Sequence, residues 1–140
     1  MLYLTGMQAL NIPCLLDTTG DWHQSCMDWE HLNLRESTNG FWGDWGIEGP
    51  KQIPGNTGTF YVADHLRALL DMLFDKNFLD AKGLRNDYIG TDQYDDLFFR
   101  QIMKMRTLPY WPEIYACMEH EYFFKWVNFE RAYSHELRGA

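Results

Sequence analysis

Apolar residues recur every three or four positions through the second half of the chain, and this spacing predicts helices there. The first stripe predicts an amphipathic helix over about residues 61–75. Its apolar positions are Val62, Leu66, Leu69, Leu70 and Leu73. A short helix is expected over 78–82, ended by Gly83. Another is expected over about 92–107, with Thr91 as its N-cap.

An aromatic stripe follows Pro112, a residue that suits the first turn of a helix because its missing amide loses no partner there. The stripe predicts one continuous helix of about five turns. Its positions are Tyr115, Met118, Tyr122, Trp126, Phe129 and Tyr133. Phe123, Phe124 and Val127 widen the apolar face. We therefore interpret this helix as central to the core, with half of an interface as the alternative.

The first part of the chain is rich in glycine and shows only short strand-like patterns. Eight of the eleven glycines precede residue 60. Short strands are predicted over 2–5 and 32–35, and one helical turn over 7–11. An irregular strand or loop is expected over 41–48, where two glycines interrupt the pattern.

Short strands followed by helices are typical of an α+β fold. We expect a single domain over residues 1–140, in which a small irregular Gly/Trp-rich sheet region (1–60) packs on a bundle of about three helices (61–140). The composition agrees with a folded domain, since 46% of residues are hydrophobic and 23% are charged. Aromatic residues reach 16%, with six tryptophans, and can build a substantial core.

The formal net charge is −8, and the acidic excess is greatest in the first part of the chain. Residues 1–60 hold two basic residues, Arg35 and Lys51, against seven acidic ones, a net of −5. An acidic surface repels nucleic acid and anionic membranes and favours a basic protein partner. No apolar run reaches the roughly 18 residues of a membrane span, and no signal peptide is recognisable. We therefore expect a cytoplasmic protein whose three cysteines are reduced.

The dipeptide Asp-Trp occurs three times within this acidic segment. Together with one further tryptophan these positions form the candidate partner-binding set, which is Asp21, Trp22, Asp28, Trp29, Trp42, Asp44 and Trp45. Tryptophan is enriched at the energetic centres of protein interfaces, and a carboxylate beside an indole suits an incoming Lys or Arg. The alternative is that these tryptophans fill a small core around glycine-rich turns.

Cysteine and histidine side chains in the same segment suggest two further chemistries. Cys14, His23, Cys26 and His31 are of types that ligate zinc, but the segment lacks the Cys-x2-Cys pair of most zinc modules. The expected site accordingly includes no metal ion and no cofactor. Cys26 beside His23, with Asp21 as orienting carboxylate, supplies the residue types of nucleophilic catalysis, although such groups are assembled in space rather than by sequence proximity.

Five segments of the chain carry a resemblance, namely 2–6, 9–14, 20–23, 43–48 and 63–71. Through them the chain resembles an uncharacterised group of small bacterial proteins associated with mobile-element or toxin–antitoxin-like loci. The resemblance covers about the first 90 residues. It assigns no activity and no catalytic residue.

The leading hypothesis is a protein-binding neutraliser of antitoxin or immunity type, which blocks a basic site on a toxin without binding nucleic acid or membrane itself. Its oligomeric state is left open. One alternative is a small enzyme centred on His23 and Cys26. Another is a small-ligand binder, which requires at least two exposed tryptophans around one concave pocket.

Overall fold

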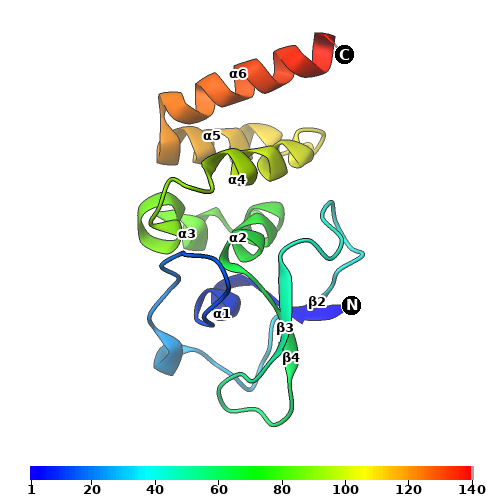
Figure 1. The fold of residues 1–140 in the computed structure, drawn as a ribbon, viewed down its shortest axis with the longest axis vertical. Coiled ribbons are helices and arrows are strands. Elements are labelled where there is room, and N and C mark those ends of the chain that lie inside the picture. Colours follow the sequence, from blue (N-terminus) through cyan, green and yellow to red (C-terminus); the bar gives the residue numbers. More distant parts are fainter. Residues whose placement is uncertain (140) are drawn as a thin grey trace. The chain divides into compact units, whose positions relative to one another are not determined.

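The computed structural model describes residues 1–139 and shows an α+β protein, as the sequence predicts. The chain forms two compact units, Met1–Asp92 and the part from Gln93 onward, and each is described by itself (Figure 1). All four strands belong to the first unit. Among the described residues, no helix combines the length and apolar character that a membrane crossing requires.

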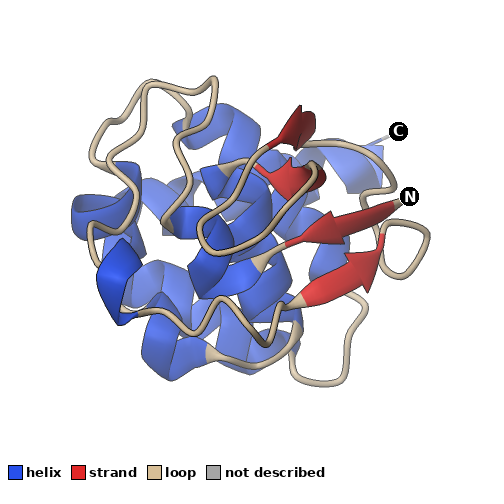
Figure 2. Cartoon of the chain, turned by 90° about the horizontal axis from the view of Figure 1, so that it is seen from below, coloured by secondary structure: helices blue, strands red, loops and turns tan. Residues whose placement is uncertain are grey.

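The sheet of the first unit is mixed and its strands are short (Figure 2). They are β1 (Leu2–Leu4), β2 (Leu34–Glu36), β3 (Ile47–Lys51) and β4 (Phe60–Ala63), in the spatial order β2-β1-β4-β3. The central pair β1 and β4 is parallel, whereas β2 and β3 pair antiparallel at the two edges. Parallel pairing of β1 and β4 brings the start of the chain beside the segment that leads into the main helix.

Helix α2 (His65–Phe74) begins later than the apolar spacing predicts. The expected start at residue 61 is wrong, because Tyr61 and Val62 pair with β1 as part of β4. Asp64 ends the strand and caps the helix, its Oδ1 accepting the backbone N–H of Arg67 at 2.8 Å. A strand rich in aromatic and β-branched residues thus precedes the helix. The predicted amphipathic character is wrong, because nine of the ten residues of α2 are buried, Arg67 and Asp71 as well as the leucines.

The core of the first unit lies where α1 (Gly6–Leu10) and α2 pack on each other and against β4. Its fully buried apolar side chains include Tyr3, Leu4, Leu10, Val62, Leu66, Leu69, Leu70 and Leu73. Three short helical elements complete the unit, which are η1 (Gln24–Cys26), α3 (Phe78–Ala81) and η2 (Leu84–Ile89). Gly83 follows α3 with a positive φ of 87°, in agreement with its predicted role as a helix end.

The second unit contains α4 (Asp95–Ile102), η3 (Met103–Met105), α5 (Trp111–Tyr122) and α6 (Phe124–Gly139). Helices α4, α5 and α6 lie side by side (Figure 1). The predicted helix over 92–107 is shorter at its start, since Tyr94 rather than Thr91 occupies the N-cap position. Its last turn tightens into the 3-10 helix η3.

The long C-terminal helix predicted from the aromatic stripe is in fact two helices. Phe123 adopts φ 53° and ψ −131°, which ends α5 and redirects the chain into α6. The aromatic stripe is divided between the two helices but meets a common partner, Phe99 of α4. The Phe99 ring contacts Tyr122 of α5 and Trp126 and Phe129 of α6 at centroid distances of 4.7, 5.4 and 5.3 Å. The predicted core is confirmed in part, around a turn that the sequence did not signal. Met118, Tyr122 and Trp126 are buried, and Tyr115, Phe129 and Tyr133 are half-buried. Phe123 and Phe124, which were expected to widen the apolar face, are exposed.

Candidate functional site

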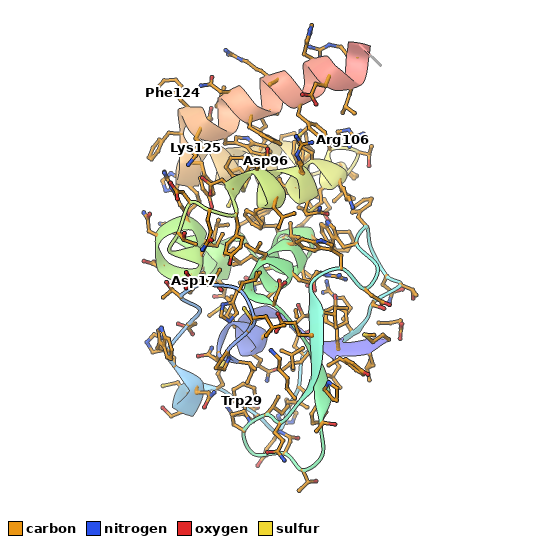
Figure 3. The ribbon with its side chains drawn as sticks, viewed as in Figure 1. Asp17, Trp29, Asp96, Arg106, Phe124 and Lys125 are labelled. Atoms are coloured by element: carbon orange, nitrogen blue, oxygen red, sulfur yellow. The ribbon has the colours of Figure 1, made fainter. Side chains whose placement is uncertain are left out.

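A cavity of about 490 Å³ lies where the loop after α1 meets the loop between β3 and β4. Its walls are Asn11, Pro13, Asp21, Trp22, Gln24, Ser25, Trp29 and Pro54. Two of the predicted Asp-Trp tryptophans, Trp22 and Trp29, thus line one hollow, and Figure 3 shows Trp29 beside these loops. We call this hollow the Trp22 cavity.

Asn11, the residue that follows α1, holds the loop that carries Asp21 and Trp22. Its side chain is buried, with Nδ2 donating to Asp21 Oδ2 at 3.0 Å and Oδ1 accepting from the His23 backbone N–H at 2.8 Å. Its carbonyl accepts from Gln24 Nε2 at 2.8 Å. One buried amide therefore fixes both sides of Trp22, whose ring remains 79% exposed.

The wall that carries Trp29 is fixed by a second set of amide side chains. Trp29 Nε1 donates to the carbonyl of Gln24 at 2.9 Å, and Asn56 Nδ2 donates to the carbonyl of Trp29 at 2.9 Å. Gln8 Nε2 donates to the carbonyls of Asp28 and His31 at 2.8 and 3.1 Å. Hydrogen bonds with buried or half-buried amide side chains therefore fix the backbone around both tryptophans of the cavity.

Each of the first two Asp-Trp aspartates pairs with a nearby histidine. Asp21 Oδ1 lies 2.6 Å from His23 Nδ1, and the Asp21 side chain is only 10% exposed. Asp28 Oδ2 lies 2.7 Å from His31 Nδ1, in an exposed pair. The hydrogen bond with His31 lowers the pKa of Asp28. The Asp28 carboxylate is accordingly ionised at neutral pH.

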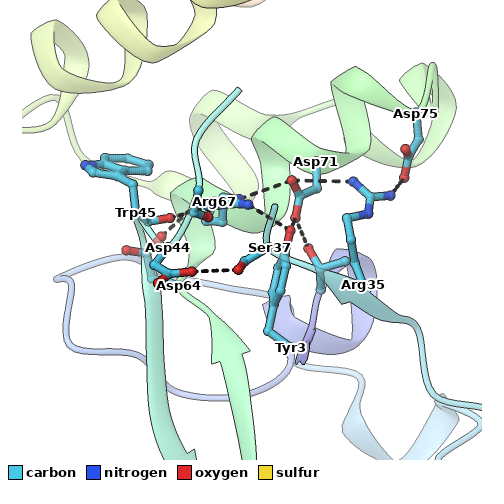
Figure 4. A network of polar contacts seen from close by, with 11 residues as sticks. Tyr3, Arg35, Ser37, Asp44, Trp45, Asp64, Arg67, Asp71 and Asp75 are labelled. Atoms are coloured by element: carbon cyan, nitrogen blue, oxygen red, sulfur yellow. Dashed lines mark hydrogen bonds and ion pairs between the residues drawn. The ribbon is translucent and has the colours of Figure 1, made fainter. Parts of the chain in front are cut away.

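The third Asp-Trp pair belongs to a different part of the first unit (Figure 4). Arg67 Nη1 donates to the carbonyls of Gly43 and Trp45 at 2.7 and 2.6 Å, and Asp44 Oδ1 accepts from Ser37 Oγ at 2.6 Å. Trp42 is only 5% exposed, so its ring offers almost no contact surface. Trp42, Asp44 and Trp45 are therefore tied into a structural network and do not line the Trp22 cavity.

The basic residues of the acidic segment are both occupied within the unit. Lys51 Nζ donates to Glu48 Oε1 at 2.6 Å and to the carbonyl of Pro13 at 2.9 Å. Arg35 pairs with Asp75 and lies 3.5 Å from Asp71. No lysine or arginine is found among the described residues that line the Trp22 cavity, and the Asp21 carboxylate there is paired with His23.

A smaller cavity of about 100 Å³ adjoins the first and shares Asn11, Pro13, Asp21 and Trp22 with it. Cys14, Thr18 and His65 also line it. Thr18 Oγ1 lies 2.7 Å from His65 Nδ1 and 3.5 Å from Cys14 Sγ, and His65 Nε2 lies 2.8 Å from the carbonyl of Ile12.

The Cys14 thiol and the His65 ring each change the pKa of the other. Burial raises the pKa of Cys14, but hydrogen bonds with His65 and Thr18 outweigh burial and bring the pKa below its usual value. Burial lowers the pKa of His65, but the interaction with Cys14 outweighs it and leaves the pKa raised. Both directions favour a thiolate beside an imidazolium.

The structure does not assemble the cysteine and histidine groupings suggested by sequence proximity. The His23 ring pairs with Asp21, and no hydrogen bond between residues 1 and 139 joins it to the exposed Cys26 thiol. Within the same range no three His, Cys, Asp or Glu side chains are placed to hold a metal ion. Cys14 instead meets His65, which lies 51 positions away along the chain.

Comparison of the chain with protein-family models, curated proteins and solved structures finds no match. Function is therefore argued from the site. Its clearest elements are the Trp22 cavity, which is lined by two indoles and by the Asp21 carboxylate that pairs with His23, and the Cys14–His65 pair next to it.

Proposed function

We propose that this protein is a binding protein of the antitoxin or immunity type, and that its Trp22 cavity receives a basic side chain from a toxin. The observation that carries the proposal is the Asp21 carboxylate beside the exposed Trp22 ring in a cavity whose described lining includes no basic side chain. The first 90 or so residues resemble proteins of toxin–antitoxin-like loci, which favours the same class of partner. The proposal places the protein in the bacterial cytoplasm.

A guanidinium or ammonium group finds two kinds of stabilisation in this cavity. The indole face of Trp22 attracts a cation, and Asp21 supplies an opposite charge. Because the Asp21 side chain is already 90% removed from solvent, little further desolvation of this carboxylate accompanies binding. The cavity volume lies within the range of about 300–1,000 Å³ that is usual for binding pockets.

The surface beside the cavity extends the same chemistry. Asp28 is exposed next to Trp29, and Glu30 follows it in the chain. Rim charges of this kind accelerate the encounter with a basic partner more than they strengthen the final complex. A toxin whose active site binds nucleic acid has the complementary positive surface.

Co-expression with the product of the neighbouring gene tests this proposal. We expect a complex that survives purification and relieves toxicity, and Trp22→Ala or Asp21→Asn to weaken it by about tenfold or more. Leu79→Ala and Asp96→Asn change an exposed leucine and an exposed carboxylate outside the cavity and serve as matched controls. A complex equally strong in all four variants, or no complex at all, contradicts the proposal.

A small cationic or aromatic ligand is the second candidate, because Trp22 and Trp29 line the same cavity. Titration of the intact protein with arginine, monosaccharides and nucleosides, followed by tryptophan fluorescence, separates the two candidates. Saturable quenching that Trp22→Ala abolishes supports the small-ligand function. Quenching that persists in Trp22→Ala places the ligand elsewhere, because four further tryptophans lie outside this cavity.

A further inference from the structure

A cysteine, a threonine and a histidine meet at the smaller cavity, and the proposed partner binding uses none of them. Cys14 is half-buried at the cavity wall, whereas His65 is only 3% exposed behind it. Thr18 lies between them, with its hydroxyl within hydrogen-bond distance of both the sulfur and the ring. A thiol that is open to a cavity and backed by a buried base has the arrangement of a reactive cysteine.

We propose that Cys14 is a peroxide-reactive thiol, a modification site at which hydrogen peroxide or a small hydroperoxide is reduced and the sulfur is oxidised to a sulfenic acid. The proposal does not rest on the partner-binding function. It stands on the cavity and on the three side chains around it.

The His65 ring is held in one orientation from both of its nitrogen atoms. Its Nε2–H donates to the carbonyl of Ile12, which can only accept, so Nδ1 is the ring atom that faces Thr18. The Thr18 hydroxyl can act as donor or acceptor, and in the proposed ion pair it accepts from Nδ1 and donates to the Cys14 sulfur. Gly20 keeps room for this ring, because a Cβ there would lie 2.7 Å from His65 Cε1.

The charged neighbours of the pair favour the imidazolium. Asp64 precedes His65, and its carboxylate stabilises the positive ring. Asp21 lines the same cavity but is paired with His23 and Asn11. The thiolate therefore has its compensating charge on His65.

The chemical step balances within this group. The Cys14 thiolate attacks one peroxide oxygen, an S–O bond forms and the O–O bond breaks. The leaving hydroxide takes a proton that His65 supplies through Thr18 and departs as water. Cys14 becomes a sulfenic acid, His65 becomes neutral, and the peroxide is the only oxidant consumed.

The chain contains its own reference thiols for the test. Cys26 is exposed, and Cys117 is half-buried with a pKa that burial raises to about 11. Wild-type protein is treated with limiting hydrogen peroxide at neutral pH in the presence of dimedone, and each cysteine peptide is quantified by mass spectrometry. We expect dimedone labelling of Cys14 to exceed that of Cys26 by about fivefold, because thiolate fraction governs the reaction. Equal or faster labelling of Cys26 overturns the proposal.

Two variants assign the effect to the neighbouring side chains. Thr18→Val keeps the shape of the residue and removes its hydroxyl, and we expect it to reduce Cys14 labelling by about threefold. His65→Gln is expected to reduce labelling to the level of Cys26. If the His65 variant does not fold, the pH dependence of iodoacetamide alkylation at Cys14 in the wild type replaces it. An alkylation midpoint at Cys14 no lower than that at Cys26 overturns the proposal.

Peroxide reactivity at Cys14 and partner binding at the Trp22 cavity can be tested separately. Cys14→Ser removes the sulfur without changing the lining of the Trp22 cavity, and we expect it to bind the partner normally. Trp29→Ala changes a residue that lines the Trp22 cavity but not the smaller one, and it is expected to retain peroxide-dependent labelling of Cys14.

Discussion

Arg67 Nε donates to Asp71 Oδ1 at 3.2 Å, and both side chains are at least 98% removed from solvent. The Asp71 carboxylate also accepts hydrogen bonds from the hydroxyls of Tyr3 and Thr5, each at 2.6 Å. Burial and the Asp71 charge raise the pKa of Tyr3, so this hydroxyl stays protonated and donates. The buried pair thereby joins β1 to α2, while the Arg67 guanidinium also fixes the loop around Trp45 (Figure 4).

Removal of Arg67 is predicted to destabilise the first unit strongly. Arg67→Met leaves the Asp71 charge buried without its main partner, and we expect the free energy of unfolding to fall by about 3–5 kcal/mol. Arg100→Met breaks an exposed pair of the same i,i+4 spacing, in which Arg100 Nε lies 2.9 Å from Asp96, and should cost less than about 1 kcal/mol. Urea unfolding followed by circular dichroism measures both. Equal losses would show that burial does not decide the strength of these pairs.

Substitution of two tryptophans from the same candidate set is predicted to change the free energy of unfolding by very different amounts. Trp42 is buried against Phe41 and Phe74 in edge-to-face contacts, so Trp42→Ala should destabilise the protein by about 3–5 kcal/mol. Trp22 is exposed, and Trp22→Ala should change the free energy of unfolding by less than about 0.5 kcal/mol. Thermal unfolding of both variants measures the difference. A large loss in Trp22→Ala would assign that ring to the core rather than to a binding surface.

Helical regions were predicted well from the sequence wherever local spacing controls them. The leucines after Asp64 lie in the helix α2 as their spacing predicts, and Gly83 follows the end of α3 as expected. The prediction failed where a non-local contact decides the structure. Val62 fits the helical spacing, but parallel pairing with Leu4 places it in β4. The break at Phe123 also has no local signal, since neither glycine nor proline marks it.

The candidate site was predicted only in part, again because contacts between residues distant in the sequence decide it. The Asp-Trp repeat correctly drew attention to Trp22 and Trp29, but the sequence could not show that Trp42 is buried beneath Arg67. Asn11 and His65 were missed because their roles arise from contacts with distant segments. The one local signal for Asn11 was its position at the end of the predicted helical turn, where an asparagine side chain can bond to the loop that follows.

Stability is predicted to depend on pH through Asp64. Burial raises the pKa of this carboxyl from 3.8 to about 6. Because the folded pKa lies above the unfolded value, the contribution of Asp64 to stability is complete below 3.8 and is lost as the pH rises through about 6. Asp64→Asn keeps an oxygen for the N-cap bond to Arg67 and removes the charge. We expect this variant to be more stable than the wild type by about 2 kcal/mol at neutral pH and to match it at about pH 3–4.

The control for Asp64 separates charge from capping. Asp64→Ala removes both the charge and the acceptor, and should be less stable than Asp64→Asn by about 1 kcal/mol at every pH. Denaturant midpoints of the wild type and both variants are compared across this pH range. A wild-type advantage over Asp64→Asn that grows with pH would mean that the ionised carboxylate stabilises the fold, which reverses the expected sign.

Phe123 is predicted to be a position where glycine stabilises the second unit. Its φ of 53° is strained for a residue with a Cβ, and its side chain is 63% exposed. The side chain of its neighbour Phe124, which is labelled in Figure 3, is 79% exposed. Relief of the backbone strain outweighs the greater conformational entropy of glycine in the unfolded chain. Phe123→Gly should therefore raise the free energy of unfolding by about 1 kcal/mol. Phe124→Gly removes a more exposed ring from the helical start of α6 and should lower the free energy of unfolding by about 0.5–1 kcal/mol. Opposite shifts in the unfolding midpoint are expected. A loss in both variants would instead show that the exposed Phe123 ring contributes more packing energy than its backbone strain costs.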